Sequence, residues 1–272
     1  MGKAVKRKQR CYLTVDFKRL FTGYPFYVAA GGIWGINLLN VLDEMRVVRE
    51  TTVLYLFNGR AVVGAFEMLL ILFAVLPYCM SFAVDWDYGY YKQALIRGKR
   101  RYYLLSKIVT VAAGTLLATV LGYLLFVLTL RMFYPLFPET AGDLRYYMGL
   151  APTAFPDAAF TAVPQIYYLV TILPEAFLYA FLACFSLYIS SCSTNRFVIL
   201  SAPVIFYYIY NHLSGTLRLP DILAWQLHRT GVFPDLPWRQ NLLYTAGYYA
   251  IWIVFMGILF AGRARRKIQG EC

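Results

Sequence analysis

Six apolar runs separated by polar segments constrain this chain more than any other feature of its sequence. A helix needs about 20 mostly apolar residues to cross the ~30 Å hydrocarbon core of a bilayer, and each run is close to that length. Over the whole chain, 60% of the 272 residues are hydrophobic and only 15% are charged, which excludes an ordinary soluble domain. We therefore predict an all-α integral membrane protein with six transmembrane helices. The predicted spans are residues 26–42, 61–83, 108–132, 166–190, 197–213 and 242–261.

The positions of the 26 Lys and Arg residues predict how these spans are oriented. Most of them lie in residues 1–25, 84–107 and 263–272, and these three segments fall on one side when six spans are drawn. Because Lys and Arg accumulate on the cytoplasmic side of membrane proteins, we predict that both termini and the 84–107 loop are cytoplasmic. The net charge of +12 then indicates membrane lipids as partners, and no nucleic-acid motif accompanies it.

The N-terminal segment, residues 1–25, combines a basic tail with an amphipathic stretch. In that stretch Leu13, Phe17, Leu20 and Phe21 share one helical side, and polar residues occupy the others. This pattern is typical of an interfacial helix that lies along the inner leaflet. The chain ends in a second basic tail, residues 263–272.

Two glycines in the first span, Gly31 and Gly35, have the small-xxx-small spacing that lets two membrane helices approach closely. We therefore expect a helix-dimer contact on this side of the first span.

Two long loops follow the third and fifth spans. Residues 133–164 contain five prolines and predict a compact outer loop with short helical turns. Residues 214–240 contain the apolar sequence LPDILAWQLHR, in which Pro220 and Asp221 suit a helix start. Two interpretations stay open for this loop: a re-entrant helix that dips back into the outer leaflet, or a folded surface lid.

Glu67 and Glu175 are the carboxylates most clearly placed inside predicted spans. An unpaired charge in hydrocarbon costs at least ~2.5 kcal/mol, so each should be paired, protonated or in contact with a wet cavity. Arg131 ends the third span at a height similar to that of Glu67 and is a candidate partner. Glu67, Arg131 and Glu175 therefore form either an intramembrane polar pair that supports the structure or a pathway for substrate or protons.

Signatures of enzyme chemistry are scarce. His212 and His228 are the only histidines, and neither lies in a metalloprotease or nucleophile motif, so we interpret both as surface or interface residues. The five cysteines form no CxxC pair, and no phosphate-binding loop of the GxxxxGK[ST] type occurs. We expect no catalytic residue, no metal site and no cofactor bound by this chain.

The polar loop has the sequence FAVDWDYGYYKQALIRGKRRYYLLSK from residue 82 to 107. With the six-span plan, the amphipathic N-terminal helix and the apolar insertion before the last span, it resembles the permease subunit of six-helix export-type ATP-binding-cassette (ABC-2-like) transporters. The resemblance implies a cytoplasmic coupling helix at about residues 85–96. The residues it assigns to coupling with an ATPase are Asp85, Trp86, Tyr90, Tyr91, Leu95 and Arg97. The alternative from the residues alone is an aromatic belt at the membrane interface.

The function that this resemblance implies is transport, with export of a substrate driven by ATP. Two copies of a cytosolic ATP-binding subunit would carry the ATP and Mg, a second copy of this permease or a related one would complete the complex, and the setting would be a bacterial plasma membrane. By itself the chain would not be an enzyme. An intramembrane enzyme or a membrane scaffold is the alternative, although the intramembrane charges are few and widely spaced for a catalytic site. Fold alone does not identify the substrate.

Overall fold

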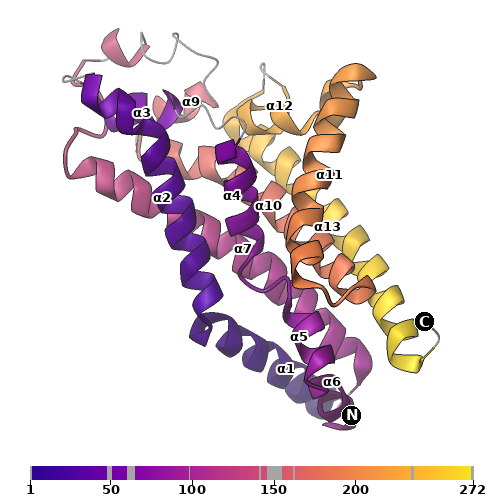
Figure 1. Ribbon diagram of the computed structural model, residues 1–272. Coiled ribbons are helices and arrows are strands. Elements are labelled where there is room, and N and C mark those ends of the chain that lie inside the picture. Colours follow the sequence, from indigo (N-terminus) through magenta and orange to yellow (C-terminus); the bar gives the residue numbers. More distant parts are fainter. Residues whose placement is uncertain are drawn as a thin grey trace.

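The computed structural model is a bundle of helices, and no strand occurs in the residues that it describes (Figure 1). Among these residues, five helices are long and apolar enough to cross a membrane, in agreement with the prediction of an all-α membrane protein. The described residues are 2–47, 51–59, 65–97, 99–140, 142–145, 155–161, 163–233 and 236–270. The five long helices are α2 (Tyr24–Val47), α7 (Arg100–Arg131), α10 (Ile166–Cys192), α11 (Arg196–Thr216) and α13 (Trp238–Gln269).

The predicted second span, residues 61–83, is not one continuous helix. It consists of α4 (Ala65–Val75), a turn, and α5 (Ser81–Asp87), while residues 61–64 lie outside the described residues. Pro77 lies in the turn, where it cannot donate a backbone hydrogen bond and cannot continue the helix that precedes it. Together α4 and α5 still carry the chain from one end of the bundle to the other (Figure 1).

Both chain termini lie at the same end of the bundle, called here the lower end after its place in Figure 1. Helix α1 (Gly2–Thr22) lies across this end of the bundle. The structure therefore has a helix in the segment for which the sequence predicts an amphipathic helix. The predicted coupling segment also lies there as α5 and α6 (Tyr90–Arg97). The short elements α3 (Val53–Gly59), α9 (Pro156–Ala159) and α12 (Trp225–Thr230) lie at the upper end.

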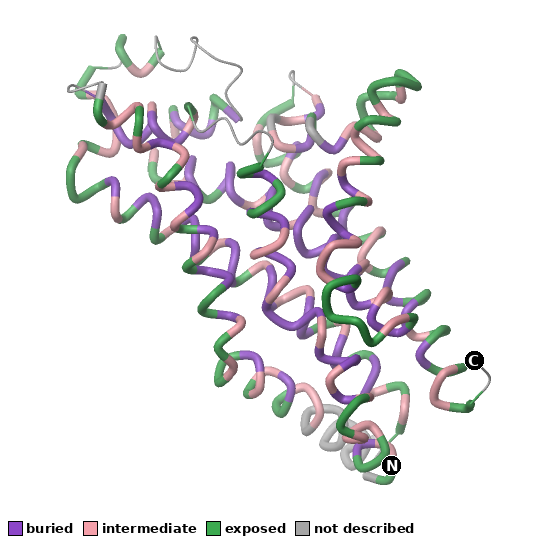
Figure 2. Tube along the Cα trace, in the orientation of Figure 1, coloured by how far each residue is buried: buried purple, intermediate pink, exposed green. Residues whose placement is uncertain are grey.

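Helix α10 forms the centre of the bundle. It packs against α4, α7, α11 and α13. Of the 18-residue apolar stretch of α10, 78% is buried in protein, compared with 22% of the corresponding stretch in α11 and in α13. Figure 2 shows this contrast as buried residues through the middle of the molecule and exposed residues on its outer helices. The outer faces of α11 and α13 are therefore available to lipid or to a partner.

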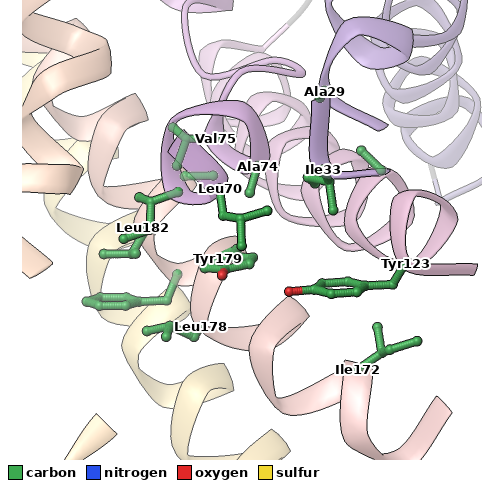
Figure 3. Close-up of a cluster of buried hydrophobic side chains, with 14 of the residues drawn as sticks. Ala29, Ile33, Leu70, Ala74, Val75, Tyr123, Ile172, Leu178, Tyr179 and Leu182 are labelled. Atoms are coloured by element: carbon green, nitrogen blue, oxygen red, sulfur yellow. The ribbon is translucent and has the colours of Figure 1, made fainter. Parts of the chain in front are cut away.

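The core between α2, α4, α7 and α10 is apolar with a few tyrosines. Figure 3 shows Ile33, Leu70, Ile172 and Leu182 in this core, with the hydroxyl groups of Tyr123 and Tyr179 inside it. A buried tyrosine hydroxyl requires a hydrogen-bond partner, so these two side chains indicate polar groups within the apolar core. The partners are charged residues at the upper end, described below.

The arrangement of α7 gives a test of topology. Lys99 directly precedes this 32-residue helix and Glu139 follows it by eight residues, and both are exposed. A helix of this length rises ~48 Å, which is more than the thickness of a bilayer with its headgroups. In a background without native cysteines, we expect Lys99→Cys to react with a membrane-impermeant maleimide only from the cytoplasm and Glu139→Cys only from outside. Labelling of both from one side would show that α7 does not cross the membrane.

Candidate functional site

Four charged side chains meet inside the lower end of the bundle and form the lower ion cluster: Asp16, Arg19, Asp85 and Lys107. The Lys107 ammonium lies 2.8 Å from Asp16 Oδ1 and 2.8 Å from Asp85 Oδ2. Arg19 donates a hydrogen bond of 2.9 Å to Asp85 Oδ1. Two carboxylates and two cations balance, so the cluster carries no net charge.

Three hydroxyl groups donate further hydrogen bonds to the two carboxylates of this cluster. Tyr78 donates to Asp16 Oδ1 at 2.7 Å, Ser106 donates to Asp16 Oδ2 at 2.5 Å, and Tyr103 donates to Asp85 Oδ2 at 2.8 Å. Buried charges are tolerated when they are both paired and hydrogen-bonded, and both conditions hold here.

The side chains of Lys107 and Asp85 are fully buried, with 0% of each exposed. Burial on its own raises the pKa of Asp85, but the attraction of Lys107 and the hydrogen bonds from Arg19 and Lys107 outweigh it and hold this pKa below its ordinary value. Asp85 therefore stays ionised at neutral pH, and its ion pairs persist there. They weaken only in acid, when the pH falls through the lowered pKa.

The lower ion cluster joins three parts of the fold that are far apart in sequence. Asp16 and Arg19 come from α1, Asp85 from α5, and Lys107 from α7. A second contact lies nearby, because the Tyr12 hydroxyl donates to the Ala94 carbonyl of α6 at 2.6 Å. The N-terminal helix, the predicted coupling segment and the first turns of α7 are thus linked by short polar contacts.

The structure places most of the predicted coupling residues inside this network. Asp85 belongs to the lower ion cluster, and the guanidinium of Arg19 lies 5.1 Å above the ring of Tyr90. Trp86 stacks on Tyr91 with ring centroids 4.4 Å apart, and Lys267 of α13 lies 4.9 Å above the Trp86 ring. Their side chains therefore pack within the chain.

Two large hydrophobic side chains, Tyr88 and Ile96, lie on the outer surface of the coupling segment beside the exposed polar residues Asp87, Lys92 and Gln93. Tyr88 is 78% exposed and Ile96 is 86% exposed, whereas Leu95 is half-buried. The Arg97 side chain lies outside the described residues. Helical period in the sequence does not give this division, because Tyr88 lies in the turn between α5 and α6 and not on either helix.

A second group of charges, the upper ion cluster, consists of Glu67, Glu175 and Arg229. Arg229 Nη1 lies 3.0 Å from Glu67 Oε1, and its Nε lies 3.9 Å from Glu175 Oε1. The Tyr207 hydroxyl donates to Glu67 Oε1 at 2.7 Å, and the Tyr123 hydroxyl donates to Glu175. Of the three states expected for these carboxylates, paired, protonated or in contact with a wet cavity, the structure has both beside the same arginine.

The cation that contacts both carboxylates is not the one expected from the sequence. Arg131 lies in the exposed last turn of α7, where the carbonyl end of the helix favours a cation. Arg229 takes the role predicted for Arg131 because the loop before α13 folds inward. In this loop Trp225 is buried, and its ring stacks on that of Tyr210 with the centroids 3.8 Å apart. The signal available in the sequence was an arginine four residues after the apolar anchor Trp225, together with two carboxylates in the spans that each need a partner.

The inward fold of this loop also changes the interpretation of the histidines. His228 is buried, with Nε2 2.8 Å from the Ile222 carbonyl oxygen and its ring 4.4 Å from that of Tyr248, so of the predicted surface or interface positions the surface one does not hold for it. Burial lowers the pKa of His228, and the neutral form is favoured. His212 is exposed.

Gly31 and Gly35 face outward from α2. A Cβ atom built on either glycine has no neighbour within 4 Å, whereas one built on Gly122 would lie 2.8 Å from the Ala30 carbonyl oxygen. Gly31 and Gly35 therefore leave room on the outside of the bundle, whereas Gly122 allows the close contact of α7 with α2 inside it.

Within the described residues, no group of three His, Cys, Asp or Glu side chains could hold a metal ion. Cys79, Cys184 and Cys192 are free thiols. Comparisons with protein-family models, with curated proteins and with solved structures found no match to this chain.

The upper ion cluster predicts a charge-swap effect. Glu67→Lys places a cation beside Arg229 and leaves a buried charge unpaired, which costs about 3 kcal/mol or more, whereas Glu67→Gln keeps a hydrogen-bond acceptor for Tyr207. We expect a large loss of thermal stability for Glu67→Lys and a smaller one for Glu67→Gln. Equal melting temperatures for the two variants would show that the charge of Glu67 is not stabilised by Arg229.

Proposed function

We propose that this chain is the permease subunit of an ATP-binding-cassette exporter. The observation that carries the proposal is the α5–α6 segment, which presents Tyr88 and Ile96 outward at the lower end while ion pairs and ring contacts fix its inner side. A rigid, exposed segment with hydrophobic anchors suits an element that receives force from a partner.

The orientation follows from the basic residues. The lower end carries both termini and the cation-rich segments, so it faces the cytoplasm of a bacterial cell under the positive-inside tendency. The six crossings are α2, α4 with the start of α5 up to residue 83, α7, α10, α11 and α13. Helix α1 lies along the inner leaflet, and the loop with α12 re-enters the bundle from the outside.

The partners follow from the surfaces that stay open. Two cytosolic ATPase subunits bind ATP and Mg, and each contacts one α5–α6 segment. The outward stripe with Gly31 and Gly35 lets α2 contact a second permease copy or a related permease.

The route of force through the permease follows from the two kinds of inner contact. The lower ion cluster connects α5 to α1 and α7, and the contact between Trp86 and Lys267 connects it to α13. Closure of the ATPases moves the α5–α6 segment, and these linkages carry the motion to the helices. The substrate moves outward as the helices of the two permeases shift.

Co-purification tests this proposal. We expect the wild-type chain to retain an ATPase subunit, identified by its phosphate-binding GxxxxGK[ST] sequence, and the variant Tyr88→Ala/Ile96→Ala to retain about tenfold less because exposed anchors are lost. The matched control is Met132→Ala/Phe133→Ala, which removes two similarly exposed side chains after α7, at the opposite end. Membrane abundance should be equal for all three proteins.

Two results would contradict the proposal. Absence of any ATPase from the wild-type preparation would favour a scaffold. Equal ATPase retention by the wild type and by Tyr88→Ala/Ile96→Ala would remove the α5–α6 surface from the docking site.

A further inference from the structure

A groove of about 780 Å³ runs between α7 and α13 on the outside of the bundle. Its walls are apolar and include Leu105, Val109, Val254 and Ile258. The side chains of Val254 and Ile258 are 60% and 65% exposed, so the chain itself leaves this surface uncovered. Small residues, Ala113 and Gly257 among them, give the groove its depth.

The groove has charge at one end only. Arg101, near the start of α7, and Arg265, near the end of α13, line it at the lower end, because the two helices run in opposite directions (Figure 1). No acidic residue is among the described residues that line it. Arg101 donates to the Tyr102 hydroxyl at 3.1 Å and lies 5.0 Å above that ring, which holds its guanidinium at the mouth of the groove.

The length of the groove matches one leaflet. From Arg101 to Leu116 on α7 the helical rise is ~22 Å, and half of a bilayer with its headgroups is ~20–22 Å thick. Two arginines at headgroup level and an apolar trench below them fit a phosphate group and an acyl chain in that order.

We propose that this groove binds one anionic phospholipid of the cytoplasmic leaflet, with its phosphate between Arg101 and Arg265 and an acyl chain along Val109 and Ile258. The site rests on the orientation given under the proposed function but not on an ATPase. A lipid bound here contacts both α7 and α13, which the lower ion cluster and Lys267 connect to the α5–α6 segment. Occupancy would therefore affect how these two helices move relative to each other.

Native mass spectrometry of the purified chain with palmitoyl-oleoyl phosphatidylglycerol or phosphatidylcholine tests this site. The wild type should bind one phosphatidylglycerol more tightly than phosphatidylcholine. Arg101→Gln/Arg265→Gln should weaken phosphatidylglycerol binding by about 30-fold, because the two arginines contribute roughly equally to the affinity for an anionic headgroup and both contributions are lost. The charge-matched control Arg196→Gln/Arg266→Gln alters two exposed arginines that do not line the groove and should bind as the wild type does.

A second variant tests the acyl-chain part without a change of charge. Ala113→Trp fills the groove and should abolish tight binding of phosphatidylglycerol. The proposal is overturned if the control pair weakens binding as much as the groove pair, which would show a general electrostatic effect, or if either groove variant binds as the wild type does. Because the chain is measured alone, failure of ATPase docking would leave this result unchanged.

Discussion

The buried ammonium of Lys107, between the carboxylates of Asp16 and Asp85, is the interaction on which the lower end depends. A lone charge in this position would be strongly destabilising, so α1, α5 and α7 must stay together for each charge to keep its partners. The cluster therefore specifies where the N-terminal helix lies and holds α5 against α7. It also fixes the inner side of the segment that we propose to contact an ATPase.

The upper ion cluster has the same role at the other end of α10. Arg229 brings the last loop into the bundle and connects it to Glu67 of α4 and Glu175 of α10. Between the two clusters the packing is apolar, with α10 at its centre. Apolar packing against lipid-facing helices specifies little by itself, because lipid tails are as apolar as leucine, so polar contacts at both ends give the arrangement its specificity. The outer faces of α11 and α13 stay open for lipid and partners.

Apolar runs predicted the long helices, and the sequence pattern placed helices in the N-terminal and 84–107 segments. The break at Pro77 was not predicted, because membrane helices often continue through proline, as α10 does at Pro174. The need for a partner of Glu67 was predicted, but not the identity of Arg229, which lies 162 positions away. The inward direction of Tyr90 and Tyr91 depends on Arg19 and Trp86, and helical period alone does not decide which face turns to a partner.

The central claim is that the lower ion cluster holds α1, α5 and α7 together, and a comparison of melting temperatures tests it most directly. Lys107→Met leaves Arg19 as the only cation beside Asp16 and Asp85 and should lower the melting temperature by about 10 °C. Lys99→Met, at an exposed position on the same end, should change the melting temperature little. Adding Asp85→Asn to Lys107→Met should restore part of the loss, because it removes the excess negative charge. Equal melting temperatures for Lys107→Met and Lys99→Met would contradict the account.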